Sequence, residues 1–198
     1  MVSTMKSDIK QYMLKNKNLN LAVNPDCFVN EVEFLDKIAQ VLSFGVKFLT
    51  IYQGGLSDFK FLQILKILRQ LTCEFEAILV VANRIDMALL AEVDGIYLNE
   101  SSIDINSAFK IIEDKMLVGF EISNLSQLND ICANNVDYFC FKSFGENFSN
   151  NLILNPRAYF GAKTKDDVLK LRNLGCRNLF LPFEVVLKHP ELTKYSYN

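Results

Sequence analysis

The feature that most constrains the fold is an alternation of short apolar runs with stretches of helical period along the whole chain. Eight runs rich in Val, Ile, Leu and Phe predict strands at residues 19–24, 47–53, 77–83, 95–100, 116–122, 137–143, 158–163 and 178–183. Helical periodicity predicts helices at 31–44, 57–72, 84–93, 105–114, 126–135, 164–175 and 185–195, whereas 144–157 shows none. This pattern is typical of an α/β fold in which helices cover a parallel sheet.

A weak internal repeat indicates how the strands are arranged. The segments GVKFLTIYQ, EVDGIYLNE, NVDYFCFKS and GCRNLFLPF begin at residues 45, 92, 135 and 175, so the even-numbered strands resemble one another. Repeated units of this kind favour a closed (β/α)8 TIM barrel. An open doubly wound sheet is the alternative, but it usually shows a Gly-rich turn after its first strand, and NPDCFVN contains no glycine.

The length of 198 residues is near the lower limit for this barrel, so we expect one compact domain over residues 1–198 with short connections. The polar segment before the first strand predicts an extra helix that closes the bottom of the barrel. The connection 144–157 predicts a reduced sixth helix. It can serve as a flap over the site or be the remnant of a lost helix.

Composition restricts the classes of partner. Lys and Arg total 21 against 23 Asp and Glu, and this net charge of −2 argues against binding to nucleic acid or to an anionic membrane surface. No apolar run approaches the roughly 18 residues needed to span a bilayer, so we expect a cytoplasmic protein, with a homo-oligomer left open.

Five cysteines and a single histidine limit the chemistry available. The cysteines have no C-x-x-C spacing and lie in apolar stretches, so we expect small buried side chains rather than disulfides or a zinc site. His189 precedes a proline near the end of the chain and is expected to lie at the surface or to pack. We therefore predict neither a bound metal nor another cofactor. The cysteines are Cys27, Cys73, Cys132, Cys140 and Cys176.

In a TIM barrel the functional site lies at the carboxyl ends of the strands, so residues there are the site candidates. Five ionisable residues end or follow predicted strands: Arg84, Glu100, Glu121, Lys142 and Lys163. Glu121 and Lys142 belong to neighbouring strands and would face one another across the mouth if both point inward. The simpler interpretation of each is a solvated rim charge, in a pair worth at most about 1 kcal/mol.

The segment YFGAKTKDDV contains the sharpest local signal. A strand runs through Gly161 and Ala162 into Lys163 and a helix that begins after Thr164. Barrels of this class often bind phosphate after their seventh and eighth strands, at a helix N-terminus, which predicts a phosphate site here. The alternative is a capping box formed by Thr164 and Asp167 that merely starts the helix.

Two long segments carry a family resemblance. Residues 79–100, LVVANRIDMALLAEVDGIYLNE, are similar to L-I-I-N-D-R-x-D-L-A followed by G-A-D-G-V-H-L-G-Q, and residues 117–144 are similar to I-G-x-S-x-H-x-x-x-E-A followed by G-A-D-Y-x-x-x-G-P-x-F. These are patterns of the thiamine phosphate synthases and the TenI-type thiazole tautomerases. The resemblance covers nearly the whole chain at low identity and implies the same small (β/α)8 barrel.

Departures from the family fall on its catalytic positions. The synthases carry Q-x-R-x-K at the end of strand 2, an Asn-Asp pair after strand 3, a magnesium-binding Asp after strand 4 and a T-x-T-K run after strand 6. The last has no match in GENFSNN. The resemblance therefore implies that the diphosphate clamp and the magnesium ligands are missing. The other positions hold Thr50, Tyr52, Gly54, Ala82, Asn83, and Ser101 or Ser102.

A TenI-type tautomerase needs only a base, a phosphate site and a shaped pocket. The histidine that serves as base in this family aligns with Ser123, and Glu121 on the same strand is its expected replacement. The resemblance thus implies a TenI-like protein that binds thiazole phosphate, with Glu121 and Lys142 as catalytic residues. The expected ligand-binding residues are Tyr52, Asn83, Ser123, Gly161, Ala162 and Lys163.

Two other functions fit the same sequence. One is a non-catalytic descendant that serves as a binding or scaffold protein among thiamine enzymes, and the other is a different phosphate-ligand isomerase on the same barrel. All three share a small phosphorylated ligand as the expected partner. A retained barrel does not by itself decide among them.

Overall fold

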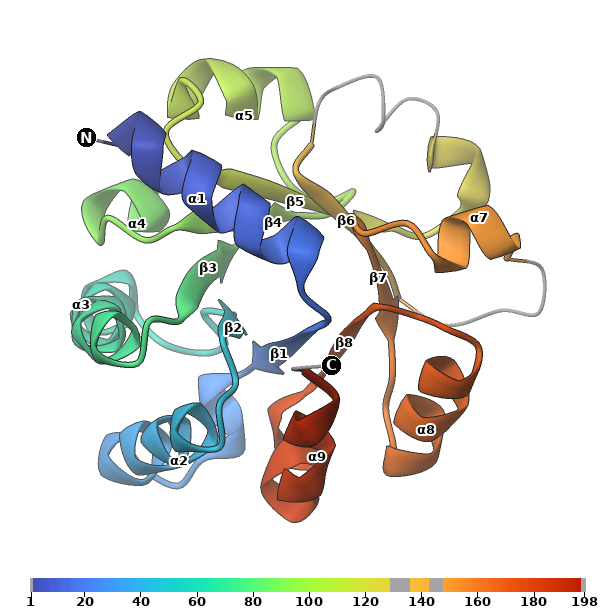
Figure 1. The fold of residues 1–198 in the computed structure, drawn as a ribbon. Helices are drawn as coiled ribbons and strands as arrows, with labels where there is room; N and C mark the ends of the chain where they lie inside the picture. Colours follow the sequence, from blue (N-terminus) through green and yellow to red (C-terminus); the bar gives the residue numbers. More distant parts are fainter. Residues whose placement is uncertain (1, 129–135, 143–147, 197–198) are drawn as a thin grey trace.

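Eight parallel strands close into a barrel in the order in which they occur in the chain (Figure 1). The structure is a computed structural model that describes residues 2–128, 136–142 and 148–196. β1 pairs with β8 as well as with β2, so the sheet has no open edge, which confirms the predicted closed barrel. The strands are β1 (Asn18–Val23), β2 (Phe48–Ile51), β3 (Ile78–Ala82), β4 (Gly95–Leu98), β5 (Leu117–Ile122), β6 (Tyr138–Phe141), β7 (Ala158–Gly161) and β8 (Asn178–Pro182).

Helices surround the strands because each buries its apolar stripe against the outer face of the barrel (Figure 1). Most begin at a side-chain cap; for example, Asn30 accepts from the Glu33 N–H at 2.9 Å. No helix in the described ranges is long and apolar enough to cross a membrane. The helices are α1 (Val2–Lys15), α2 (Glu31–Ser43), α3 (Asp58–Glu74), α4 (Ile85–Leu90), α5 (Ile105–Ile112), α7 (Asn150–Ile153), α8 (Lys165–Asn173) and α9 (Phe183–Lys188), with 3-10 turns η1 (Pro25–Cys27), η2 (Leu125–Gln127) and η3 (Pro190–Ser196).

Three helix predictions need correction or qualification. The connection 144–157 contains the four-residue helix α7, whose cap Ser149 accepts from Leu152 N–H at 3.4 Å. The predicted helix at 185–195 is wrong as one element, because Pro190 has no N–H to donate and α9 ends at Lys188, after which η3 begins. Only the start of the predicted helix at 126–135 is observed, as part of η2, and residues 129–135 lie outside the described ranges.

The N-terminal helix α1 lies across the amino ends of the strands, as predicted (Figure 1). Met13 is 3 % exposed and packs with Phe48 and Ile78 in the cluster that fills the barrel interior. Two lysines of the same helix, Lys6 and Lys10, pair with the buried carboxylate of Asp137 just before β6. Apolar contact and ion pairing together hold α1 on the bottom of the barrel.

The prediction that the cysteines are buried is only partly correct. Cys140 on β6 and Cys176 before β8 are buried, whereas Cys27 and Cys73 are exposed. Cys27 ends the turn η1 in the loop after β1, and Cys73 lies in the last turn of α3. An apolar sequence neighbourhood predicted burial, but the side-chain direction put these two thiols in solvent. Cys132 lies outside the described residues.

Two inward-facing glycines are required because neighbouring groups occupy the space of a Cβ. A Cβ on Gly119 would overlap the ring of Tyr138, and one on Gly161 would overlap the Lys142 carbonyl. The barrel can therefore hold large rings on β6 only because β5 has no side chain at the facing position.

We expect Gly161→Ala to lower the free energy of unfolding by about 1–3 kcal/mol, the usual cost of overpacking, because the Lys142 backbone cannot move without disturbing β6. Gly55→Ala is the matched control, since its Cβ would meet nothing closer than 3.4 Å. Urea unfolding followed by circular dichroism measures both variants. If both variants have the same free energy of unfolding, the space between β6 and β7 accepts a Cβ at position 161, and this explanation of Gly161 is wrong.

Candidate functional site

A pocket of about 190 Å³ opens at the carboxyl ends of the strands. Its walls come from seven of the eight strands or the residues that directly follow them, so the closed barrel creates it. This is the end of a TIM barrel at which catalytic sites occur. The pocket is lined by Ala22, Tyr52, Tyr97, Glu121, Cys140, Lys142, Gly161, Ala162, Lys163, Phe180 and Pro182.

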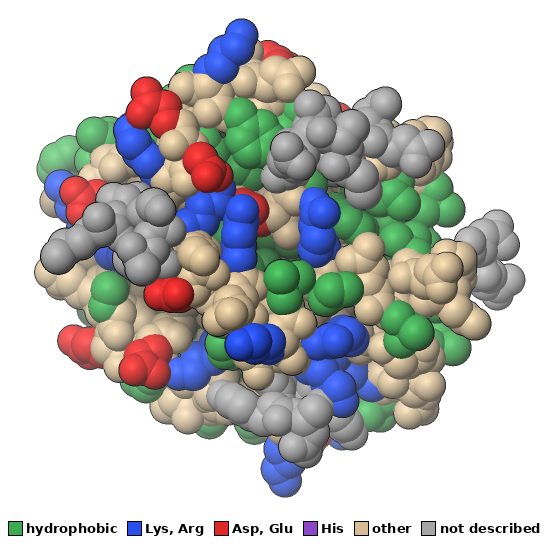
Figure 2. All heavy atoms as spheres, turned by 45° about the horizontal axis from the view of Figure 1, so that its top comes forward, with side chains coloured by type: hydrophobic (Ala, Val, Ile, Leu, Met, Phe, Trp, Pro, Cys, Tyr) green, Lys and Arg blue, Asp and Glu red, His purple; other side chains and the backbone are tan. Residues whose placement is uncertain are grey.

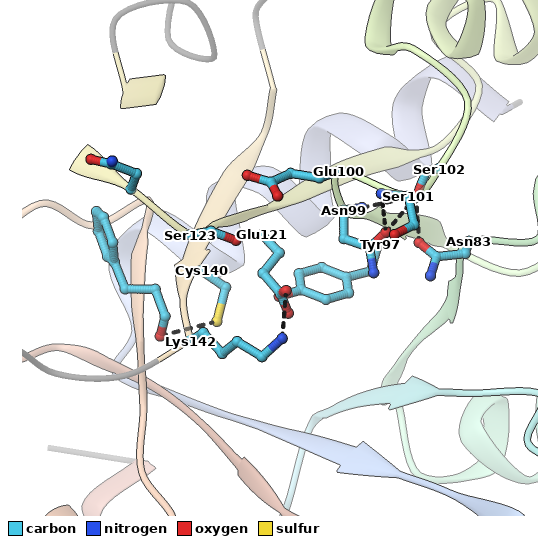
Figure 3. A network of polar contacts seen from close by, with 12 residues as sticks. Asn83, Tyr97, Asn99, Glu100, Ser101, Ser102, Glu121, Ser123, Cys140 and Lys142 are labelled. Atoms are coloured by element: carbon cyan, nitrogen blue, oxygen red, sulfur yellow. Dashed lines mark hydrogen bonds and ion pairs between the residues drawn. The ribbon is translucent and has the colours of Figure 1, made fainter. Parts of the chain in front are cut away.

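Glu121 lies at the centre of the polar contacts in this pocket (Figure 3). One carboxylate oxygen, Oε1, is 3.3 Å from the Lys142 ammonium, and the other, Oε2, accepts from the Tyr97 hydroxyl at 3.3 Å. The Glu121 side chain is 13 % exposed, whereas that of Lys142 is 72 % exposed. The structure thus brings the two predicted catalytic residues together, with the carboxylate held inside and the ammonium in reach of solvent.

Aromatic rings make up the floor beside this carboxylate. Tyr97 stacks on Phe180 with ring centroids 5.3 Å apart and an interplanar angle of 22°. Burial raises the pKa of Tyr97 well above its ordinary value, and burial also raises the pKa of Tyr52. Both phenols therefore stay protonated at neutral pH and serve as hydrogen-bond donors.

Cys140 is a thiol rather than a thiolate in this pocket. It is fully buried, and that burial raises its pKa far above the ordinary value. Because the thiolate is the nucleophilic form, this raised pKa disfavours Cys140 as a nucleophile, and its side chain lines the pocket.

The loop after β7 satisfies its own main-chain donors. The Ala162 N–H donates to the Phe180 carbonyl at 2.9 Å, and those of Lys163 and Thr164 both donate to Asp167 Oδ2 at 3.0 Å. Thr164 Oγ1 accepts from the Asp167 N–H in return, so the capping box is present. The close approach of β6 accounts for Gly161. An anion here would rely on the Lys163 ammonium rather than on these N–H groups.

Two predicted ligand residues do not line the pocket. Asn83 adopts a left-handed conformation with φ of 60°, and its Oδ1 accepts from Ser102 Oγ at 2.5 Å, beside Asn99 (Figure 3). Ser123 is exposed, and its N–H donates to Gln127 Oε1 at 3.0 Å. The pocket gathers the other six predicted residues.

The polar cluster beside the pocket does not fit a magnesium ion. Its oxygens belong to the neutral side chains of Asn83, Asn99 and Ser102, which hydrogen-bond to one another. Nearby Glu100 accepts from the Gln127 side chain. Within residues 2–128, 136–142 and 148–196, no group of three or more His, Cys, Asp or Glu side chains that could hold a metal ion is found.

Arg84 is held at the rim and does not line the pocket. Its guanidinium donates to Asp58 at 2.7 Å, to Asp86 at 2.6 Å and to Gln53. These hydrogen bonds hold the pKa of Asp58 and the pKa of Asp86 below their ordinary values. The arginine that follows β3 is therefore committed to joining the β2 and β3 loops.

Five pocket residues escaped the sequence prediction, namely Ala22, Tyr97, Cys140, Phe180 and Pro182. They lie inside strands, whereas the prediction considered only strand ends. Strand geometry would have predicted Cys140. Successive side chains alternate between the two faces of a strand, so Cys140, two residues before Lys142, must point to the same inward face.

The fold and the site define the class as a compact (β/α)8 barrel with a small pocket at its mouth that is lined by a Glu–Lys ion pair. The profile of the family described as thiamine monophosphate synthase matches residues 21–149, which is more than half of the chain. The chain therefore belongs to the thiamine monophosphate synthase family.

Individual relatives agree with this assignment at low identity. A thiamine-phosphate synthase of Hydrogenobaculum sp. (strain Y04AAS1) is 27 % identical over 132 residues, which are 66 % of this chain and 62 % of that relative. Thiamine-phosphate synthase 1 of Aquifex aeolicus is 26 % identical over 195 residues, covering 88 % of this chain and 91 % of the relative. The structure of thiamine phosphate pyrophosphorylase from Pyrococcus furiosus superposes with a TM-score of 0.76 at 19 % identity, covering 94 % of this chain and 96 % of that one, and shares the fold.

We expect Arg84→Ala to lower the melting temperature by about 2 °C at pH 7 and to leave ligand binding at the mouth within twofold. Because Asp58 and Asp86 have lowered pKa values in the folded state, their stabilisation is present above the unfolded value of about 4 and is lost as the pH falls below it. The difference between wild type and variant in thermal unfolding should therefore shrink toward pH 3. A constant difference would contradict this role.

Proposed function

We propose that this protein is a TenI-like member of its family, which binds a small phosphorylated heterocycle of the thiazole phosphate class and moves a proton on it. The observation that carries the proposal is the Glu121 carboxylate, 13 % exposed and held between the Tyr97 hydroxyl and the Lys142 ammonium on the pocket wall. A confined carboxylate with two donors and an aromatic floor supports proton transfer on a planar ring.

Each of these groups has one task in the proposed reaction. Glu121 removes a proton from a ring carbon of the bound heterocycle and returns it at the tautomeric position, so the enzyme ends in its starting protonation state. Tyr97 is a positioning residue, because its hydroxyl fixes the orientation of the carboxylate. The ammonium groups of Lys142 and Lys163 line the same pocket and bind the anionic groups of the ligand.

The arrangement around β2 argues against synthase chemistry. Thr50 is fully buried and donates to Asn20 Oδ1 at 2.9 Å inside the barrel, and Tyr52 presents a neutral phenol. Gly54 closes a turn against Asp26 and Asn24. Displacement of pyrophosphate requires cations or a metal on the leaving group, and these positions supply none.

Purified protein given thiazole phosphate, the pyrimidine diphosphate substrate and magnesium should release no pyrophosphate above background, because the cationic clamp and the metal ligands are missing. An enzyme-coupled pyrophosphate assay measures this. A turnover on the order of 1 s⁻¹ or more would establish synthase activity and overturn this part of the proposal.

The wild-type protein should incorporate solvent deuterium into the thiazole carboxylate phosphate. Glu121→Gln should slow this exchange at least about 100-fold with little change in ligand affinity, because it removes the base and keeps the shape. Lys142→Ala should instead weaken binding. Mass spectrometry follows the exchange, and calorimetric titration measures the affinity.

Glu100→Gln is the matched control, because Glu100 is a rim carboxylate bonded to Gln127 and does not line the pocket. It should exchange deuterium at the wild-type rate. If Glu100→Gln and Glu121→Gln have equal effects, Glu121 is not the base. Binding without exchange by the wild type would favour the non-catalytic scaffold protein instead.

A further inference from the structure

A second cavity, of about 850 Å³, lies on the outside of the barrel between α8 and η3. It follows α8 from Lys165 in the first turn to Arg172 in the last and reaches Lys17 just before β1. None of its lining residues lines the mouth pocket, which is less than a quarter of its volume. Its volume lies in the range of about 300–1,000 Å³ that is typical of small-molecule sites.

The charge of this groove is opposite to that of the chain. Four cationic side chains, Lys17, Lys165, Arg172 and Lys194, line it together with the single carboxylate of Glu191, whereas the whole chain has a net charge of −2. Figure 2 shows Lys and Arg side chains gathered over the middle and lower parts of the molecular face that α1 crosses. This excess of positive charge does not itself stabilise the barrel, because like charges repel one another.

Part of the groove has a fixed geometry. The Arg172 Nη1 donates to the Cys176 carbonyl at 2.8 Å and to that of Arg177, which holds the guanidinium in place. Lys165 pairs with Glu191 at 2.7 Å, and this contact holds the pKa of Glu191 below its ordinary value. The Nη1 group of Arg172 is thus used by the main chain, and its Nε and Nη2 atoms are buried, so Arg172 shapes the wall of the groove.

The rim and the floor of the groove differ in character. Within the described part of the chain, no carboxylate lies within ion-pair distance of Lys17 or Lys194. Beneath this cationic rim lie the apolar side chains of Leu169, Cys176 and Leu192, the last two at most 2 % exposed. Burial raises the pKa of Cys176 to about 11, so the thiol is neutral and belongs to the apolar floor.

We propose that this groove is a second binding site, independent of the mouth, for a small organic phosphate. Its phosphate groups bind Lys17 and Lys194, and its apolar ring packs on Leu169 and the floor. Adenosine diphosphate represents this class as a probe, and inorganic pyrophosphate represents the same charge without the ring.

Calorimetric titration of the full chain tests the site. Adenosine diphosphate should bind at least tenfold more tightly than pyrophosphate, and its affinity should fall as salt rises from 50 to about 200 mM. The double variant Lys17→Ser with Lys194→Ser should weaken binding at least tenfold. Leu169→Ala should weaken the binding of adenosine diphosphate but not that of pyrophosphate.

Two control variants test whether the probes bind at this groove, rather than through the overall positive charge of the protein or in the mouth pocket. Lys66→Ser with Lys110→Ser removes the same charge from exposed positions on α3 and α5 and should keep the affinity within twofold. Lys142→Ala should also keep the affinity for adenosine diphosphate within twofold, because Lys142 lines the mouth pocket and not the groove. The test of the groove is therefore distinct from the test of the mouth. The proposal is overturned if neither probe binds at 1 mM, if both lysine pairs have equal effects, if pyrophosphate binds as tightly, or if only Lys142→Ala abolishes binding.

Discussion

The pairing of β1 with β8 is the interaction on which the remaining structure depends. Asn178 holds this seam, because its Oδ1 accepts from the main-chain N–H and the side-chain amide of Asn18, each at 3.1 Å. Its own amide donates to the Pro156 carbonyl at 2.7 Å, and both asparagines are buried. Once this seam is closed, alternate side chains of all eight strands point at one axis, and the volume around that axis has to be filled.

Large aromatic rings pack in that volume, and they limit the space left at the mouth. Tyr138 occupies the space that a side chain on Gly119 would take, and Tyr138 and Tyr159 pack with ring centroids 5.2 Å apart. Because the interior is closed by these rings, only about 190 Å³ remains above them, beside Glu121. The small pocket and the confined carboxylate therefore have the same origin.

The internal repeat has a structural meaning that bears on the family resemblance. Asp94 and Asp137 occupy the same position in their repeats, and each carboxylate accepts from a main-chain N–H of the preceding strand, at Leu79 and Val118 respectively, both at 2.8 Å. These aspartates correspond to the Asp in the G-A-D-G and G-A-D-Y patterns. They lie at the amino ends of the strands, so this part of the resemblance reflects barrel stability rather than catalysis.

The amino-acid sequence by itself determined the barrel, because the two periodicities and the even-strand repeat are local properties of the chain. It also identified Glu121, Lys142 and Lys163, since strand ends can be read from the apolar runs. Only the tertiary structure decided that Tyr97 meets Glu121, that Arg84 is committed to Asp58 and Asp86, and that the Lys163 and Thr164 N–H groups are already bonded to Asp167. The physical reason is that these contacts join residues from different strands and loops, and their geometry exists only after the sheet has closed on itself.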